Sequence, residues 1–311
     1  MKKFLRQICA EVLRLKDYKI KRLKVVKLMI LPLLILSLAM TGCGGNTSGG
    51  DDKKVSSDTN KIKLGMITRL NASEENFGEF MKKIEETLDV KLASHTPVFF
   101  DNLNAMQMAL QSGQIDEIST YRSVARYMTA HDPRYSVLKD HSLEFIDSFC
   151  FALRGDETEL RDSLNAVIKE MQSDGTLDKL TKEYITDIKA DTEPPVVELP
   201  HFDSAQTIKV AVTGDLPPLD YVNAEGKPAG FNTAVLAEIG TRMLKNIELV
   251  QIDSGARAAA LTSKQVDVVF WAIVPVSEII PSDVDKPEGI ALTEPYYKDK
   301  IVHMAFSEEK K

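Results

Sequence analysis

A short motif that occurs twice constrains the fold of this chain more than any other feature. Residues 109–118 and 260–269 share Ala-Leu, a polar turn containing Ser, an apolar residue and an Asp, followed by Glu-Ile in the first copy and Val-Val in the second. Each copy is typical of a helix with Ala and Leu on its buried side, a turn, and a short strand that begins at the Asp. A strand-like segment, 62–67 or 208–212, precedes each copy. The repeat predicts two α/β units of similar build, with a ligand cleft between the carboxyl ends of their strands.

Length and composition agree with two such units. The chain has 311 residues, of which 43% are hydrophobic, 7% aromatic and 27% charged, as in ordinary soluble globular proteins. Two units of roughly a hundred residues each fit the usual size of a domain. The predicted fold class is therefore α/β, with two lobes and a central cleft.

The first 42 residues do not fit the globular pattern. Ten Lys or Arg and two acidic residues precede Cys43, which gives this leader a charge of about +8, and residues 28–40 are mostly apolar. That run is short for a transmembrane helix. Residues 40–45, Met-Thr-Gly-Cys-Gly-Gly, resemble a bacterial lipobox with Met in place of the usual Leu. The resemblance implies a lipoprotein signal peptide over 1–42 and lipidation of Cys43. An ordinary signal peptide or a retained anchor helix is the alternative.

Residues 43–60 are predicted to be a flexible tether, because 46–60 combine Gly, Ser, Thr, Asp and Lys without apolar periodicity. The protein would then lie on the outer face of the cytoplasmic membrane, or in the periplasm, on a lipid anchor. The whole chain has a net charge of −7, so removal of the leader leaves about −15, which argues against nucleic acid as a partner. Cys150 lies in an apolar run and is predicted to be a buried, inert thiol.

The second unit carries a family resemblance. Its motifs lie at 212–221, 226–232, 234–239 and 293–297, with Arg257 between them. In this order they resemble the first lobe of bacterial extracellular solute-binding proteins of family 3, the polar amino-acid type, which have a periplasmic-binding-protein type 2 fold. The resemblance implies two lobes that close on a small solute.

The first unit resembles the other lobe of the same family. Residues 64–75 match its strand and helix start, and such a helix start offers free backbone N–H groups to an anion. Residues 151–180 resemble the closing segment, which ends the chain in ordinary members. The predicted domains are therefore the usual second lobe with closing helices at 61–187, a Pro-rich and acidic linker at 188–206, and the usual first lobe at 207–307.

We interpret this reversed order as one binding protein that is circularly permuted. The alternative is a tandem protein reduced to half of each module, with its lobes completed by a neighbouring chain. Permutation predicts that residues 301–306 lie close to 149–153 at the hinge between the lobes.

The resemblance also implies a pair of charges for an amino-acid ligand, an Arg for its carboxylate and an Asp for its ammonium group. Aligned on the two motifs, these positions fall at Ile279 and Tyr121, and neither residue carries the charge. An α-amino acid in the usual pose is not expected, because each unpaired buried charge would cost several kcal/mol.

Other side chains near the predicted cleft could replace this pair. An aromatic wall with an arginine as anion partner would suit a small organic anion or an aromatic or cyclic solute. The alternatives are a core position for the Trp, packing under its loop for the Tyr at 221, and solvated surface positions for the arginines. The candidate ligand-binding residues are Asp215, Tyr221, Arg257, Trp271, Thr68, Arg69 and Tyr121.

The predicted function is capture of a small polar or aromatic solute, amino-acid-like or an organic anion, for an ABC permease in the membrane. A sensor or accessory protein that contacts a receptor, or a degenerate binding module, is the alternative. A lyase or glycan-cleaving enzyme on the same fold is less favoured, because no catalytic motif is present. The five histidines are scattered, without metal-ligand spacing such as His-x-x-x-His, so neither a metal nor a cofactor is expected.

Overall fold

The computed structural model describes residues 61–71, 74–88, 95–139, 145–189, 191–277, 280 and 282–307. The described residues all lie in one compact unit of the chain, Asn60–Lys311. The predicted signal peptide, Cys43 and the tether lie outside the described residues. Within the part that is described, each helix is too short or too polar to cross a membrane.

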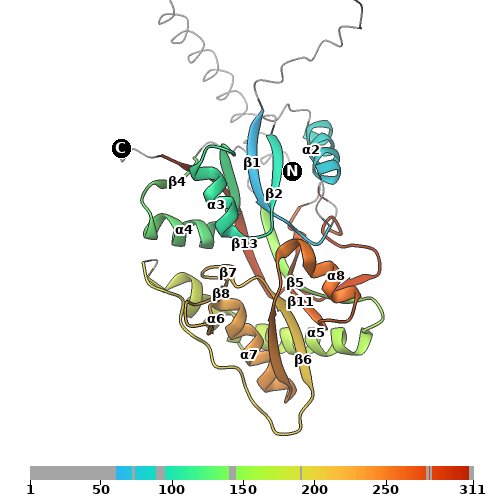
Figure 1. Ribbon diagram of the computed structural model, residues 1–311. Coiled ribbons are helices and arrows are strands. Elements are labelled where there is room, and N and C mark those ends of the chain that lie inside the picture. Colours follow the sequence, from blue (N-terminus) through green and yellow to red (C-terminus); the bar gives the residue numbers. More distant parts are fainter. Residues whose placement is uncertain are drawn as a thin grey trace, which may run out of the picture. The chain divides into compact units, whose positions relative to one another are not determined.

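One ten-stranded sheet runs through the described chain (Figure 1), in the order β10-β6-β11-β5-β13-β3-β1-β2, with β12 beside β5 and β4 beside β13. Its strands are β1 (Ile62–Ile67), β2 (His95–Phe100), β3 (Glu117–Tyr121), β4 (Tyr135–Val137), β5 (Ile146–Arg154), β6 (Thr207–Val212), β10 (Asn246–Gln251), β11 (Val268–Pro275), β12 (Ile290–Leu292) and β13 (Tyr297–Phe306). A small second sheet consists of β7 (Asp215–Leu216), β8 (Asp220–Val222) and β9 (Pro228–Ala229).

Helices cover this sheet in two groups, which define two lobes (Figure 1). The N-terminal lobe, residues 61–139 with the end of β13, contains α2 (Glu74–Leu88), α3 (Leu103–Gln111) and α4 (Arg122–His131). The C-terminal lobe, residues 145–300, contains α5 (Thr158–Ser173), α6 (Thr176–Thr181), η1 (Lys182–Thr186), α7 (Phe231–Met243), η2 (Ser254–Ala256) and α8 (Arg257–Thr262). The predicted two-lobed α/β build is present.

The predicted closing helices pack on the C-terminal lobe. Both α5 and α6 contact α7. Arg242 on α7 forms ion pairs with Glu170 at 3.1 Å and with Asp174 at 2.8 Å, at the end of α5. The closing segment therefore belongs in space to the lobe that follows it in sequence.

Two antiparallel strands connect the lobes. Residues 297–300 of β13 pair with 149–146 of β5, and Ile301–Met304 then continue along β3, opposite Tyr121–Ile118. The prediction that residues 301–306 lie close to 149–153 is wrong for these segments, because 301–306 pair with β3 and β4. The part of β13 that pairs with β5 is the preceding one, residues 297–300. The strands β5 and β13 form the connection at which one lobe can turn against the other.

The repeated motif forms the same pair of hydrogen bonds in each lobe, between an Asp and the backbone of a Lys on the neighbouring strand. This pair of hydrogen bonds is called the Asp–Lys clasp below. The Asp116 carboxylate accepts a hydrogen bond from Lys63 N at 2.7 Å, and Asp116 N donates to Lys63 O at 2.9 Å. Asp267 makes the same two bonds to Lys209, both at 2.9 Å. The strands begin one residue after each Asp, because the Asp bridges to the neighbouring strand instead of pairing within the ladder. The Ala and Leu of both copies are buried, as predicted.

Candidate ligand site between the lobes

A recess lies between the lobes at the carboxyl ends of β1 and β3. The cavity within it is small, about 20 Å³, which is about the space of one water molecule. Three of the candidate residues, Arg69, Tyr121 and Trp271, line this recess together and so lie at one site. The lining residues are Met66, Ile67, Arg69, Ser119, Thr120, Tyr121, Leu216, Trp271 and Ile301.

Trp271 reaches the recess from a distorted position in β11. The register between β11 and β5 shifts between Val269 and Ala272, and Trp271 has a φ of 38°. Such a φ is unusual for a bulky residue and costs of the order of 1–3 kcal/mol unless surrounding groups hold it. A bulge of this kind redirects a side chain out of the regular alternation of a strand. The indole Nε1 is buried and has no hydrogen-bond partner among the described residues, so it remains available as a donor.

Arg257 holds this bulge. Its Nη1 donates to the carbonyls of Phe270 at 3.4 Å and Trp271 at 3.3 Å, and its guanidinium carbon lies 4.7 Å from the centroid of the Trp271 ring. Its Nε donates to Ser254 O at 3.2 Å. Carbonyls that the bulge removes from the ladder are thereby satisfied, and the ring is fixed by a cation–π contact. Arg257 acts on the site through Trp271.

The same arginine reaches across to the N-terminal lobe, where its Nη2 donates to Thr68 O at 3.1 Å. Arg257 is fully buried, and this burial lowers its pKa although carboxylates, Asp285 foremost, act in the opposite direction. No carboxylate in the described part of the chain lies at ion-pair distance from it. The alternative of a solvated surface position is therefore wrong for Arg257.

Arg69 and Tyr121 share a buried carboxylate at the hinge. Asp147, on β5, lies 3.3 Å from Arg69 Nη2 and accepts a hydrogen bond from the Tyr121 hydroxyl at 3.1 Å. Burial raises the pKa of Asp147, against the opposing effect of Arg69. Burial alone would lower the pKa of Arg69, but nearby acidic groups, Asp147 first among them, outweigh it and raise the value.

Sequence reasoning missed Asp147 and Asp285. Asp285 is buried and accepts hydrogen bonds from Asn71 N at 3.1 Å and Ile273 N at 3.2 Å, so it connects the lobes beside Arg69. A signal for Asp147 existed, since it is an acidic residue at the start of an otherwise apolar strand. Asp285 lies in an irregular loop of polar residues, where no pattern distinguishes it.

The remaining candidates occupy other positions. The Asp215 carboxylate accepts a hydrogen bond from Leu103 N at the start of α3, in the opposite lobe, and burial raises its pKa. The Thr68 hydroxyl donates to Phe100 O at 3.1 Å. Tyr221 does not line the recess. Its hydrogen bond with Glu193 of the predicted linker raises its pKa to about 12. Ile279 lies outside the described residues.

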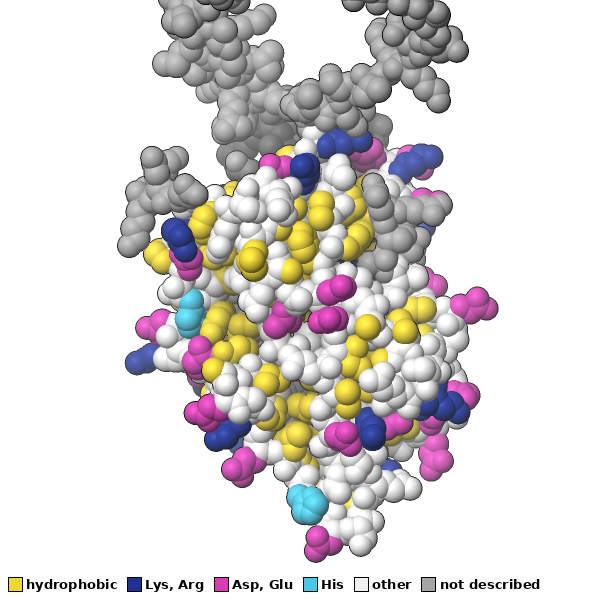
Figure 2. All heavy atoms as spheres, viewed as in Figure 1, with side chains coloured by type: hydrophobic (Ala, Val, Ile, Leu, Met, Phe, Trp, Pro, Cys, Tyr) yellow, Lys and Arg dark blue, Asp and Glu magenta, His cyan; other side chains and the backbone are white. Residues whose placement is uncertain are grey.

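The lobes are in contact around the recess. Besides the bonds of Arg257, Asp215 and Asp285, Asp101 accepts hydrogen bonds from Ser254 N and Gly255 N, both at 3.1 Å. Figure 2 shows acidic side chains gathered on one face where the two lobes meet. These contacts describe a closed arrangement with a negatively charged border.

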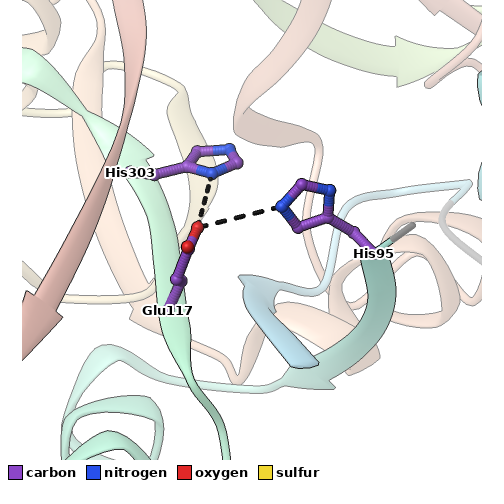
Figure 3. A group of neighbouring side chains, drawn as sticks. All are labelled: His95, Glu117 and His303. Atoms are coloured by element: carbon purple, nitrogen blue, oxygen red, sulfur yellow. Dashed lines mark hydrogen bonds and ion pairs between the residues drawn. The ribbon is translucent and has the colours of Figure 1, made fainter. Parts of the chain in front are cut away.

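A second group of polar side chains adjoins the recess but shares no residue with it. His95, Glu117 and His303 come from β2, β3 and β13, and their ligand-type atoms all lie within 4.8 Å of one another (Figure 3). The histidines that are scattered in sequence are thus partly assembled by the sheet. Spacing along the chain could not reveal this, because each residue comes from a different strand.

Comparison with known proteins finds one family match, in the C-terminal part of the chain. Residues 208–308 match the sequence model of the bacterial extracellular solute-binding proteins, family 3. The match covers 101 of the 311 residues, and this segment is similar to that family. It includes Asp215, Arg257 and Trp271, and it supports the predicted periplasmic-binding-protein-like α/β fold. No curated protein sequence matches the chain.

Solved structures with a similar arrangement share little sequence with the chain. The ligand-binding component of an ABC-type import system from Staphylococcus aureus, solved with zinc bound, is 12% identical, with 80% of this chain and 67% of that chain covered and a TM-score of 0.39. The methionine-binding protein MetQ is 10% identical, with 81% of this chain and 85% of that chain covered and a TM-score of 0.36. A protein from Clostridium difficile described as a lipoprotein is 14% identical, with 82% of this chain and 86% of that chain covered and a TM-score of 0.34.

Proposed function

We propose that this protein captures a small polar or aromatic solute, amino-acid-like or an organic anion, by closure of its two lobes, and presents it to an ABC permease. The observation that carries this proposal is the recess where Arg69, Tyr121 and Trp271 meet between two lobes, one of which matches the sequence model of a solute-binding family. Solute-binding sites are expected in such interlobe clefts.

The side chains of the recess suggest what the solute offers. The unpartnered indole N–H of Trp271 needs an acceptor such as a carboxylate or carbonyl oxygen. The rings of Tyr121 and Trp271, with centroids 6.0 Å apart in an edge-on arrangement, provide an apolar wall. Arg69 lines the recess and pairs with the buried Asp147, which does not line it, so Arg69 can face an anionic group of the solute while Asp147 holds the guanidinium in place.

We also propose that the chain is a permuted binding protein that closes within one molecule. The direct pairing of β13 with β5, followed by its pairing with β3, supports this order, since a hydrogen-bonded strand can replace the covalent crossover of an ordinary member. Lipid attachment at Cys43 and a place on the outer membrane face complete the proposal. They rest on the lipobox resemblance.

The test begins with a thermal-shift screen of the full chain in mild detergent against amino acids, organic acids, cyclic amides and short peptides. A ligand at 100 times its Kd should stabilise the protein by about 2.7 kcal/mol, which raises its melting temperature by several degrees. A panel without any stabilising solute would contradict capture and favour the degenerate-module alternative.

Two matched substitutions then locate the site by calorimetry with the solute found. Trp271→Phe keeps an aromatic ring but removes the N–H donor, and we expect about tenfold weaker binding, since a hydrogen bond to a charged acceptor contributes about 1.5 kcal/mol. Tyr221→Phe removes a hydroxyl outside the recess, and its Kd should stay within about twofold. Equal losses in both variants would place the solute elsewhere.

A further inference from the structure

Three side chains on one face of the N-terminal lobe converge on a common point (Figure 3). The Glu117 Oε2 lies 3.0 Å from His303 Nδ1 and 3.8 Å from His95 Nε2. The two imidazole rings stand nearly perpendicular, at 84°, with centroids 5.6 Å apart. Each ring therefore presents a nitrogen, rather than a ring face, to the same carboxylate oxygen.

Strand register explains this convergence. His95 pairs with Ile62 on β1, Glu117 pairs with Leu64 on the same strand, and His303 pairs with Ser119 on β3. Side chains alternate between the faces of a sheet, so residues two apart share a face. By this count all three side chains lie on one face, and three rigid strands hold them in place.

The three side chains are partly buried and suited to a cation. Their exposed fractions are 12% for His95, 14% for Glu117 and 17% for His303. Burial would raise the pKa of Glu117, but hydrogen bonds from His303 and His95 outweigh it and lower the value to about 2. Both imidazoles face this carboxylate, through His95 Nε2 and His303 Nδ1.

We propose that His95 Nε2, Glu117 Oε2 and His303 Nδ1 bind a divalent transition-metal ion, with Zn²⁺ as the best fit. Two imidazoles and one carboxylate, with a position left for water, are a common set of zinc ligands. Mg²⁺ and Ca²⁺ prefer oxygen ligands and would bind poorly here. Zinc bonds of about 2.0–2.1 Å place tetrahedral ligands roughly 3.3 Å apart. The observed 3.0 and 3.8 Å to Glu117 need shifts of less than about 1 Å, and the two histidine nitrogens, within 4.8 Å of each other, need a shift of at most about 1.5 Å.

This site adjoins the solute recess but shares no residue with it. Ser119 and Ile301, which line the recess, lie two residues from Glu117 and His303. Tyr121 lies four positions beyond Glu117 on β3, which is roughly 13 Å along a strand. A bound ion would connect β13, the strand that crosses between the lobes, to the edge of the N-terminal lobe. It would stabilise that lobe whether or not solute is present.

The experiment titrates the full chain, freed of metal with a chelator, with ZnCl₂ by calorimetry and with CoCl₂ by visible absorption. We expect one Zn²⁺ per chain with a Kd in the micromolar range or below, a cobalt spectrum in the tetrahedral range, and no comparable heat from MgCl₂. Absence of Zn²⁺ binding at sub-millimolar concentration would overturn the proposal.

Substitutions assign the ion to these residues. Glu117→Gln preserves shape but removes the charge, and His303→Ala removes a ligand. Each should weaken Zn²⁺ binding at least about tenfold and abolish the cobalt spectrum. The control His201→Ala removes an exposed histidine that contacts only Asp203 among the described residues, and should leave the Kd unchanged.

Circular dichroism checks the fold of each variant, and His95→Gln serves in place of His303→Ala should the latter not fold. Unchanged affinity in folded Glu117→Gln would show that the ion binds elsewhere and would overturn the assignment. Because this readout uses only the metal, its outcome is independent of whether a solute is ever found for the recess.

Discussion

The two lobes share one scaffold and differ where the strand after the shared motif ends. In both, an Asp clasps the backbone of a Lys on the preceding strand, through Asp116 and Lys63 in one lobe and Asp267 and Lys209 in the other. After Asp116, β3 continues regularly to Tyr121. After Asp267, β11 bulges and turns Trp271 to a φ of 38°.

This difference shows that the repeated motif determines the shared arrangement of strands and helices, whereas the bulge in β11, which only one lobe has, shapes the recess. A second regular strand would place its side chains alternately on the two faces of the sheet. The bulge instead sends Trp271 towards Tyr121, and Arg257 supplies the hydrogen bonds that the interrupted ladder has lost. The C-terminal lobe therefore depends on one buried cation in a way that the N-terminal lobe does not.

The largest predicted effect follows from this dependence. Arg257→Ala leaves buried carbonyls, including those of Phe270 and Trp271, without donors and opens a cavity. We expect a loss of about 3 kcal/mol in the free energy of unfolding. The melting temperature should fall by roughly 10 °C, which denaturant titration and calorimetry can measure.

Arg126 is the matched control for this substitution. It also donates to backbone carbonyls, those of Ile185, Thr186 and Ile188 at 3.1–3.2 Å, but it is exposed. Water can replace its hydrogen bonds, so Arg126→Ala should cost about 1 kcal/mol or less. Similar losses in the two variants would mean that the bulge does not need Arg257.

The shared arrangement of strands and helices was predictable because it depends on local pattern. The paired motif gave two α/β units and their buried Ala and Leu residues from periodicity alone, and the structure confirms both. The strands were predicted to begin at Asp116 and Asp267, but β3 and β11 begin one residue later. Nothing in the sequence distinguishes an Asp that begins a strand from an Asp that hydrogen-bonds to the backbone of the neighbouring strand. Cys150 is buried, as its apolar surroundings indicate, and burial raises its pKa to about 12.

The site was only partly predictable because its geometry depends on long-range register. Arg69, Tyr121 and Trp271 were chosen as residues that follow strands. Only Arg69 does so, since Tyr121 ends β3 and Trp271 lies within β11. They meet because the antiparallel strands β5 and β13 join the two lobes. The bulge has no sequence signal, so the burial of Arg257 and its carbonyl partners could not be foreseen. The His95 and Glu117 neighbourhood likewise arises from strands β2 and β3, which are two positions apart in the sheet.

A smaller effect should separate the two clasps. Asp116→Ala removes an exposed hydrogen bond and should cost about 1 kcal/mol. Asp267 lies in addition 3.5 Å from Arg154, whose guanidinium also donates to the carbonyls of Leu261 and Val266. Asp267→Ala should therefore cost about 0.5–1 kcal/mol more than Asp116→Ala, as measured by urea unfolding.

The double variant tests whether the clasps act separately. They belong to different lobes and share no partner, so their losses should add within about 0.5 kcal/mol. A larger loss in the free energy of unfolding for Asp116→Ala than for Asp267→Ala would contradict this prediction. It would show that the hydrogen bonds of Asp116 stabilise the N-terminal lobe more than those of Asp267 stabilise the C-terminal lobe.

The smallest predicted effect concerns the closing helices, which only the C-terminal lobe has. Asp174 accepts a hydrogen bond from Thr176 N at 2.9 Å and pairs with Arg242 on α7, and these contacts lower its pKa to about 2. Because the folded state favours the ionised form, its stabilising effect is complete above the ordinary pKa of an Asp and is lost as the pH falls from about 4 to 2. Melting temperatures across this range should fall slightly less steeply for Asp174→Asn than for the unaltered chain, while the exposed control Asp191→Asn should follow the unaltered chain. A parallel course for Asp174→Asn would mean that α5 and α6 dock on α7 through their apolar faces alone, without a contribution from the ion pairs of Arg242.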